Sequence, residues 1–415
     1  MTEPPSSAPT APLARVLDLR DAVLLGLGSI VGTGVFVSLG LAAGIAGPAV
    51  LLAVLLAAAV AAANGLSAAQ LAAAHPTSGG TYEYASRLLG RPWALIAGWT
   101  FLAAKSASAA TAALGVAGYV LTALGAAPER LPRTALALAV VAALTALVAG
   151  GVRRSSRTNA VIVAITLTAL AALVAAAVPS MLRHPDRLWP FSGTGAAGAD
   201  PSDLFHATAL VFVAFTGYGR VATLGEEVRD PTRTIPRAVV LALLVSAVLY
   251  VVVTAAALAT VGAVELGASA RAGGAPLEAA ARASSAPDVR WLVGGAAITA
   301  MLGVILNLLL GLSRVVLAMA RRRDLPGALA TVDARRSSPR TAVIAVGVVI
   351  AGLALIGNVR LTWSLSAFTV LVYYAVTNLA ALRLAPSQRR YPRAVAGAGL
   401  ITCVTLAVWL AARSV

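Results

Sequence analysis

Eleven apolar runs in this chain are long enough to cross a lipid bilayer, and they restrict its fold more than any other feature. A transmembrane helix needs about 20 predominantly apolar residues, and inside lipid each backbone polar group must be paired within the structure. The sequence therefore predicts an all-α polytopic membrane protein with about eleven transmembrane helices. The predicted spans are residues 21–44, 49–74, 94–124, 134–151, 158–178, 204–225, 237–261, 291–319, 341–357, 362–383 and 394–412.

Charged residues are few and lie mostly between these runs. They make up 12% of the 415 residues, while 59% are hydrophobic, and the net charge is +16. Cytoplasmic loops of membrane proteins collect Arg and Lys, so we interpret the excess as an orientation signal and not as a nucleic-acid-binding surface. With the N-terminus inside, twenty loop arginines lie inside and nine outside. This pattern predicts a multi-pass plasma-membrane protein with a cytoplasmic N-terminus.

Two further features limit the class of protein. Residues 1–17 are rich in Pro, Ser, Thr and Ala and lack a signal-peptide pattern, which predicts a disordered cytoplasmic tail. The single cysteine, Cys403, allows no disulfide within the chain and no cysteine metal site. No span carries paired carboxylates, a His–carboxylate pair or a metal-ligand cluster. We therefore expect no cofactor, no metal and no enzymatic activity.

The first apolar run contains four glycines, at positions 26, 28, 32 and 34. Each glycine costs a helix roughly 1 kcal/mol relative to Ala. A backbone that opens at membrane depth is tolerated where it lines a cavity, and its free N–H groups suit a carboxylate. Close packing of helices through small residues is the alternative interpretation of the same glycines.

A second glycine interruption lies in the sixth run, at Gly217 and Gly219, with Thr216 and Tyr218 as polar neighbours. The first and sixth runs hold corresponding positions in two halves of five spans each. Paired interruptions of this kind are typical of inverted-repeat transporters with a site near the bilayer midplane. We assign the repeats to residues 18–180 and 203–384, and an additional C-terminal helix to 394–415.

Several motifs, spread from residue 28 to residue 326, resemble those of the amino acid–polyamine–organocation (APC) superfamily of amino acid permeases. The resemblance is to the bacterial branch that is similar to cationic amino acid transporters. The motifs are GSIVGTGVF at 28–36, PTSGGTY at 76–82, FVAFTGY at 212–218, GEEVRDPTRTIPR at 225–237, SRVVLAMAR at 313–321 and DLP at 324–326.

The resemblance implies a LeuT-like fold, with two inverted five-helix repeats and the substrate held where helices one and six unwind. It implies an amino acid carboxylate on the backbone amides of Gly32, Thr33 and Gly34. It also implies that backbone carbonyls accept hydrogen bonds from the ammonium group, with an aromatic lid above the substrate. Those carbonyls belong to Ile30, Val213, Ala214 and Thr216, the lid is Phe215, and Ser29 and Gly217 complete the expected substrate-binding set.

A single lysine, Lys105, accompanies thirty-one arginines and falls inside the third span. In relatives, a lysine on the fifth helix replaces a sodium ion, but the matching residue here is Thr166. A buried lysine can lose its proton, whereas arginine effectively cannot. Our hypothesis is that Lys105 occupies or borders the same space and serves proton coupling. The alternative is a lysine that reaches the membrane surface or forms a structural pair.

The connections contribute two further expectations. Glu226, Glu227 and Arg229 are candidates for an inner gate that pairs with Arg87 or Arg153, although a solvated loop is the alternative. The long connection 262–290 is predicted to carry one short helix at 277–282 that covers an external cavity, with a plain linker as the alternative.

Together these features predict a secondary transporter of amino acids that works by alternating access in a lipid bilayer, with a proton as coupling ion. No Asp or Glu falls near the middle of a span, which favours neutral amino acids. An exchanger without ion coupling and a non-transporting amino acid sensor on the same scaffold are the alternatives.

Overall fold

The computed structural model describes residues 17–75, 79–151, 156–189, 201–222, 228–332 and 339–414. Within these ranges the regular structure is helical, apart from one isolated bridge between Leu17 and Val228. The α-helices are α1 Leu19–Ile30, α2 Leu39–Ala46, α3 Val50–Ala74, α4 Gly80–Leu88, α5 Arg91–Ala123, α6 Arg130–Ala149, α7 Ser156–Arg183, α8 Pro201–Phe215, α9 Gly219–Ala222, α10 Pro231–Arg271, α11 Pro276–Arg282, α12 Val289–Arg321, α13 Arg340–Leu355, α14 Val359–Leu382 and α15 Arg393–Ser414.

The eleven predicted spans all fall on helices. Nine helical stretches in the described residues are long and apolar enough to cross a membrane. The first of these, Leu19–Ala74, contains both the first and the second predicted span, and the ninth predicted span is the shorter helix α13, with 16 residues. The all-α polytopic prediction is therefore confirmed.

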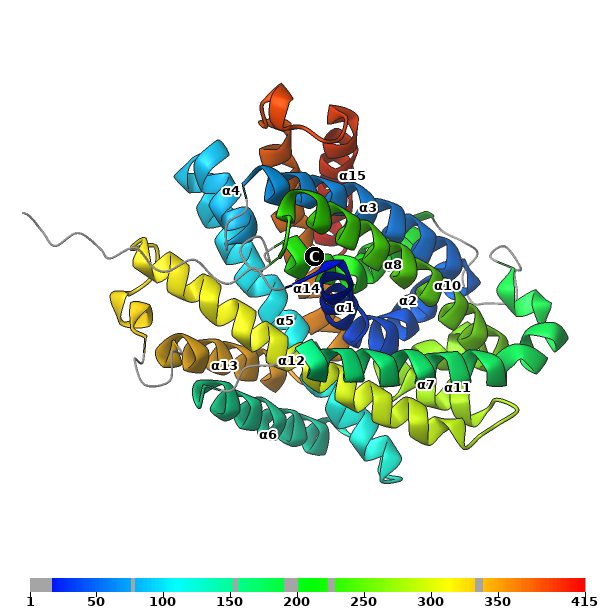
Figure 1. Ribbon diagram of the computed structural model, residues 1–415. Helices are drawn as coiled ribbons and strands as arrows, with labels where there is room; N and C mark the ends of the chain where they lie inside the picture. Colours follow the sequence, from blue (N-terminus) through cyan, green and yellow to red (C-terminus); the bar gives the residue numbers. More distant parts are fainter. Residues whose placement is uncertain are drawn as a thin grey trace, which may run out of the picture.

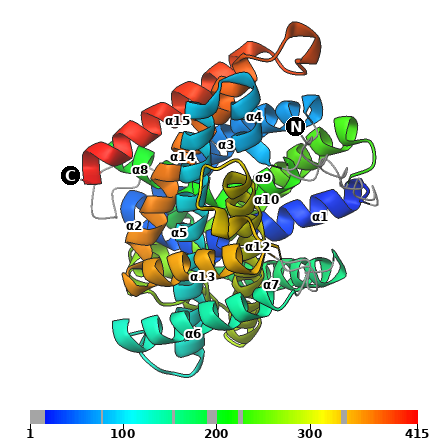
Figure 2. The ribbon, with the colours of Figure 1, turned by 90° about the vertical axis from the view of Figure 1, so that its left-hand side faces the viewer.

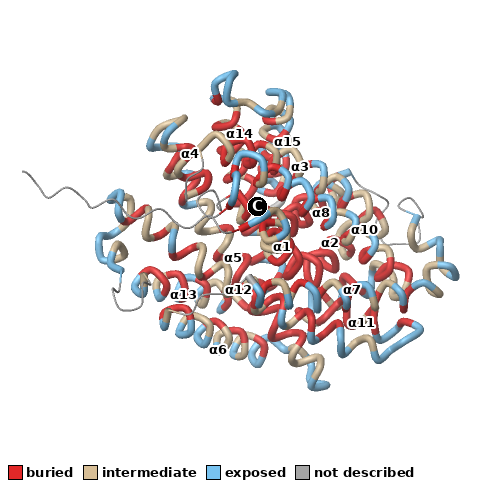
Figure 3. Tube along the Cα trace, in the orientation of Figure 1, coloured by how far each residue is buried: buried red, intermediate tan, exposed pale blue. Residues whose placement is uncertain are grey.

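The interrupted first and sixth spans lie in the interior of the bundle. Figure 1 shows α1 and α2 near the centre of the helices, and Figure 2 shows α1 entering from the right-hand side between α10 and α7. Residues 39–43 of α2 and 207–215 of α8 are buried. Exposed apolar side chains such as Leu244, Val348 and Ile401 lie on the surrounding helices, so buried segments concentrate in the middle of Figure 3. This arrangement places both interruptions away from lipid, as an opened backbone requires.

Helix α5 contacts the centre of the bundle through small side chains. From residue 104 to residue 119 all its residues except Lys105 are buried, and most are Ala, Gly, Ser or Thr. Lipid is as apolar as leucine, so helices in a membrane associate through close packing and hydrogen bonds. Two such bonds join α5 to α14, at 3.0 Å between the Ser108 and Ser366 hydroxyls and 2.7 Å between those of Thr111 and Thr362.

The connection after the seventh span is more helical than expected. Helix α10 has 41 residues and continues to Arg271, beyond a kink at Gly262 where φ is +78°. Helix α11 follows at Pro276–Arg282, so the short helix predicted at 277–282 is confirmed. The prediction of a loop from residue 262 to that helix is wrong, because a further helical stretch follows the non-helical Gly262 and runs to Arg271. We call residues 263–282 the lid segment, and the end of the bundle that carries it the lid face.

Arginines at the lid face bind backbone carbonyls. Arg133 donates to the carbonyls of Ala272 and Gly357, the latter at 2.8 Å. Arg187 donates to the carbonyl of Thr260 at 3.0 Å, just before the kink in α10. The last carbonyls of a helix have no partner within it, and a cation there also interacts favourably with the helix dipole. These arginines therefore hold the connections of the lid face, besides contributing to the charge pattern.

Candidate functional site

The first span is broken in the middle of the bundle. Helix α1 ends at Ile30, Val31 adopts an extended conformation (φ −81°, ψ 95°), and helical structure resumes with a π-helical turn at Gly34–Ser38 that leads into α2. The first N–H groups of a helix have no internal partner and lie at its positive end. The side-chain hydroxyl of Thr33 is buried here without a hydrogen-bond partner among the described residues. The predicted interruption of the first span is therefore present.

The sixth span is interrupted by a tighter turn. Helix α8 ends at Phe215, a 3₁₀ turn covers Thr216–Tyr218, and α9 continues from Gly219. The chain therefore changes its helical form here without a fully extended residue. The paired interruptions are confirmed, but they differ in shape.

The glycines of both spans also allow close contact between them. A Cβ atom on Gly34 would overlap Ala214, and a Cβ on Gly217 would overlap the backbone carbonyl of Ser29. A Cβ on Gly32 would overlap the side chain of Val304 on α12. The two interpretations of the glycine stretch are therefore compatible, because the same residues open the backbone and let the broken spans cross.

Each of the four carbonyls expected to bind an ammonium group lies within hydrogen-bond distance of a side-chain hydroxyl. Tyr250 on α10 lies 2.8 Å from the Ile30 oxygen and 3.2 Å from the Ala214 oxygen. Tyr374 on α14 donates to the Thr216 carbonyl at 3.3 Å. The Thr216 hydroxyl donates to the carbonyl of Val213 at 2.7 Å. A carbonyl has two lone pairs, so each can accept a second donor.

Tyr250 also supports the predicted aromatic lid. Its ring packs against Phe215 with 4.9 Å between the centroids, and both side chains are fully buried. Neither Tyr250 nor Tyr374 was predicted as part of the site. Their positions in the sequence could have indicated a role, because each is a tyrosine well inside an apolar run. Polar groups at such positions are costly and usually have a function.

Lys105 binds the interruption of the sixth span. Its Nζ donates to Thr216 Oγ1 at 2.9 Å, and the same hydroxyl donates to the Val213 carbonyl. Thr166, by contrast, is buried and donates to the carbonyl of Ile162 on its own helix. Asn159 on the same helix α7 contacts the first span, with its amide 2.8 Å from the Leu24 carbonyl. The two ion-coupling candidates are therefore not joined by a hydrogen bond within the described chain.

The predicted inner gate is only partly visible. Glu226, Glu227 and Arg153 lie outside the described residues. Arg229 is exposed, and its backbone N–H donates to the Leu17 carbonyl at 2.9 Å. Arg87, one of the expected gate partners, pairs with Glu83 of its own helix at 2.8 Å.

A polar cluster missed by the sequence analysis joins α4, α5 and the end of α12, at the face opposite the lid segment. Asp324 accepts hydrogen bonds from the Tyr82 hydroxyl at 2.6 Å and from Arg91 at 2.9 Å. Arg322 pairs with Glu83 and lies over the Tyr82 ring, 5.4 Å from its centroid. Burial and the bond to Asp324 raise the pKa of Tyr82 to about 12. Tyr82 and Asp324 belong to the motifs at 76–82 and 324–326, but the motifs do not show that the two side chains form a hydrogen bond.

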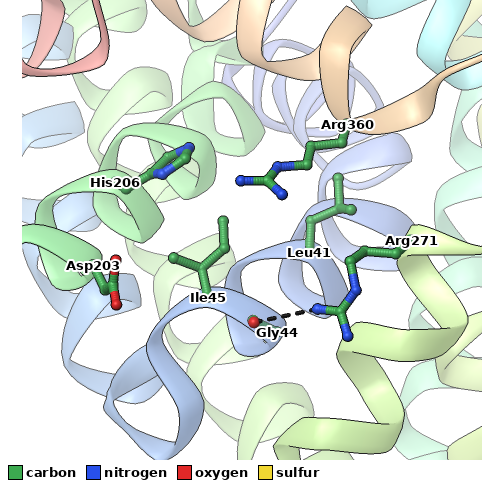
Figure 4. Close-up of a pocket in the computed structure, with 7 residues that line it drawn as sticks. All are labelled: Leu41, Gly44, Ile45, Asp203, His206, Arg271 and Arg360. Atoms are coloured by element: carbon green, nitrogen blue, oxygen red, sulfur yellow. Dashed lines mark hydrogen bonds between the residues drawn. The ribbon is translucent and has the colours of Figure 1, made fainter. Parts of the chain in front are cut away.

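At the lid face, a cavity of about 250 Å³ lies between α2, α8, α10 and α14 (Figure 4). Arg271 closes one side by donating to the Gly44 carbonyl at 3.3 Å. The lining residues are Leu41, Gly44, Ile45, Asp203, His206, Arg271 and Arg360. The cavity therefore lies at the end of the second half of the broken first span, next to the lid segment.

Three comparisons agree with this architecture. The amino acid permease family model matches residues 21–414. An uncharacterised transporter of Mycobacterium tuberculosis is 44% identical over 405 residues, which cover 97% of this chain and 88% of that protein. The branched-chain amino acid permease BcaP of Bacillus subtilis is 29% identical and covers 95% of this chain and 86% of its own length.

The crystal structure of MhsT in complex with L-phenylalanine matches with a TM-score of 0.65 at 16% identity, and the match covers 94% of this chain and 98% of that one. This likeness, together with the apolar helices and the two interrupted spans, shows the LeuT-like fold. The matching relatives are transporters and not enzymes. The chain therefore belongs to the amino acid permease family of the APC superfamily and is a multi-pass membrane transporter of amino acids.

Proposed function

We propose that this permease is a secondary active transporter that carries a neutral amino acid by alternating access and is coupled to protons. The observation that carries the proposal is the pair of interrupted spans, where helical structure restarts at Gly34 and the carbonyls of Ile30 and Ala214 converge on the Tyr250 hydroxyl. A helix start suits a carboxylate, and carbonyls suit an ammonium. Backbone recognition of this kind selects the groups that all α-amino acids share.

The neutral side chain is inferred from the charges around the site. The expected substrate-binding residues, from Ser29 to Gly34 and from Val213 to Gly217, include no carboxylate. Among the described residues, the buried or half-buried acidic groups lie elsewhere: Glu83 and Asp324 in the cluster opposite the lid, Glu278 in the lid segment, Asp203 in the lid-face cavity and Asp21 in the first turn of α1. A cationic side chain would need a partner at the site. The relative BcaP is named for branched-chain amino acids, which have neutral side chains.

Proton coupling is inferred from Lys105. Its ammonium donates to Thr216, whose hydroxyl in turn donates to an expected ammonium-binding carbonyl. A lysine in a membrane interior can exist with or without its proton. Loss of the proton removes a cation next to the site, and the binding of substrate and of proton are thereby linked. Thr166 is the second coupling candidate, as the residue that stands where relatives carry a lysine.

The arrangement in the membrane follows from the same proposal. The N-terminus and the α4 cluster lie in the cytoplasm, and the lid segment lies outside the plasma membrane, in agreement with the arginine asymmetry. Residues 18–180 and 203–384 form the two repeats that move relative to each other. Glu226, Glu227 and Arg229 contribute to the cytoplasmic gate.

The test is uptake of a panel of labelled amino acids into proteoliposomes, with and without an inward proton gradient. Accumulation of neutral amino acids that depends on the gradient supports the proposal. Counterflow without accumulation would establish an exchanger and leave Lys105 as a structural link to Thr216. Binding without uptake would favour a sensor on the same scaffold.

A further inference from the structure

Glu278 is a buried carboxyl group that the proposed transport cycle does not use. It lies on α11, its side chain is 2% exposed, and Arg282 donates to Oε1 at 3.2 Å. The second oxygen, Oε2, is buried without a hydrogen-bond partner in the described structure. A buried ionised carboxylate needs partners for both oxygens, because its desolvation otherwise costs on the order of several kcal/mol. This side chain has a partner for only one oxygen.

The lid segment that carries Glu278 packs on the second half of the broken first span. A Cβ on Gly40 would contact Ala270 and Pro276 of the lid segment. Arg271 reaches the Gly44 carbonyl (Figure 4). Helix α11 itself packs against α7, α10, α12 and the π-helical turn. Glu278 is buried where α11 packs on the bundle, so its burial depends on the lid segment staying closed.

The charged groups around Glu278 favour its ionised form. Arg282 lies on its own helix, and Arg290 at the start of α12 acts on it through space; both lower its pKa, but burial outweighs them and raises it. Tyr119 is the titratable neighbour on α5, and the π-helical turn carries no charged residue. At the lid end of the two other packed helices, the exposed charged groups are Glu265 and Arg271 on α10 and Arg183 on α7. The closed lid thus disfavours the carboxylate despite two nearby guanidinium groups.

We propose that Glu278 is a proton-binding site of the lid segment, occupied when the lid is closed and released when it opens. A protonated carboxyl carries no charge to desolvate, so the closed lid binds the proton more tightly than the open lid. By linkage, acid on the lid face favours the closed state and alkali favours the open state. The inference rests on the proposed function in one respect, that alternating access opens the lid face to the outside.

The experiment measures the opening of the lid by thiol labelling. Cys403 is buried in the last span, and a C403A, I45C protein presents one thiol in the cavity beside the lid (Figure 4). A membrane-impermeant maleimide is applied to proteoliposomes between pH 4.5 and 8. At each pH the labelling rate is divided by that of the same protein with Glu278→Gln, so that the intrinsic titration of the thiol cancels. The proposal expects this ratio to rise with pH, by up to about tenfold per unit, the limit for one linked proton.

Two further variants separate the role of Glu278 from general effects of charge. Glu265→Gln removes an exposed carboxylate from the same segment and is expected to leave the pH profile unchanged. Arg282→Gln removes a group that lowers the pKa of Glu278, and is expected to shift the profile to higher pH. A ratio that stays flat with pH would overturn the proposal, as would an equal effect of Glu265→Gln. Because labelling needs no substrate, such a failure is distinct from a failure of uptake, which bears on the proposed function.

Discussion

The ammonium group of Lys105 lies 2.9 Å from the hydroxyl of Thr216, which joins the third span to the interruption in the sixth. The same hydroxyl donates to the Val213 carbonyl. The only lysine of the chain is thus one hydroxyl group away from a carbonyl expected to bind the substrate. A change in its charge therefore alters the donors and acceptors next to the site.

Lys105→Ala is expected to abolish accumulation driven by a proton gradient while retaining counterflow. The substitution removes the titratable group but leaves the backbone carbonyls of the sixth span in place. The measurement is uptake into proteoliposomes over a pH series, with Thr216→Val as a companion that removes the hydroxyl and keeps the lysine. Unchanged accumulation with unchanged pH dependence in the alanine variant would show that Lys105 has no part in coupling.

Tyr250→Phe is expected to weaken substrate binding with little loss of protein. The variant keeps the ring that packs on Phe215 and removes only the hydroxyl that holds Ile30 and Ala214. A hydrogen bond of this kind contributes about 0.5–1.5 kcal/mol, so the apparent affinity should fall roughly 2- to 12-fold. The measurement is substrate binding by the purified protein.

Tyr374→Phe is the matched control, because it removes a longer bond of 3.3 Å to the Thr216 carbonyl in the same site. A smaller effect is expected from it. An affinity that is unaffected by Tyr250→Phe would mean that its hydroxyl does not position the two broken ends.

Asp324→Asn is expected to destabilise the folded protein at neutral pH. The hydrogen bond from Tyr82 and the bonds from Arg91 hold the pKa of Asp324 below its ordinary value of 3.8. A carboxyl with a lowered pKa stabilises the folded state above the ordinary value, and this contribution is lost as pH falls through the folded-state pKa. Loss of hydrogen bonds to a charged group costs about 1.5–3 kcal/mol each. Thermal unfolding in detergent should therefore show a lower Tm at pH 7 and a difference from the parent protein that shrinks as the pH falls below 3.8.

Asp230→Asn provides the comparison for that experiment. Asp230 lies 3.9 Å from Arg233, and both side chains are more than half exposed. An exposed pair of this kind contributes about 0–1 kcal/mol. If the two variants were equally stable, the cluster around Asp324 would not hold the ends of α4, α5 and α12 together.

The fold could be predicted largely from local patterns. Runs of apolar residues locate the spans, and glycines at positions 32, 34 and 217 locate the interruptions, because both signals lie within one segment. The lid segment was missed in part because Gly262 interrupts the helix, and the local sequence does not show that a second helical stretch follows it and packs on α2.

The remaining parts of the site depend on residues far apart in the chain. Tyr250 reaches a carbonyl 220 positions away, and Tyr82 reaches Asp324 across 242 positions. Such partners follow from which helices cross and at what depth, which apolar periodicity does not specify. The unpaired oxygen of Glu278 was missed for the same reason, since burial of the lid segment is a property of the assembled bundle.

Gly34→Ala is expected to abolish transport and to lower stability. Its Cβ would overlap the Cβ of Ala214 and approach the Tyr250 hydroxyl to 3.0 Å, so the two broken spans would have to move apart. Overpacking of this kind costs about 1–3 kcal/mol. Gly311→Ala on α12 is the matched control, because no atom beyond its chain neighbours and the adjacent backbone of its own helix lies within 4 Å of the position that its new methyl group would take, and an alanine in a helix gains up to about 1 kcal/mol. Uptake and Tm are measured for both variants. Full activity of Gly34→Ala would show that the spans do not cross at this contact during transport.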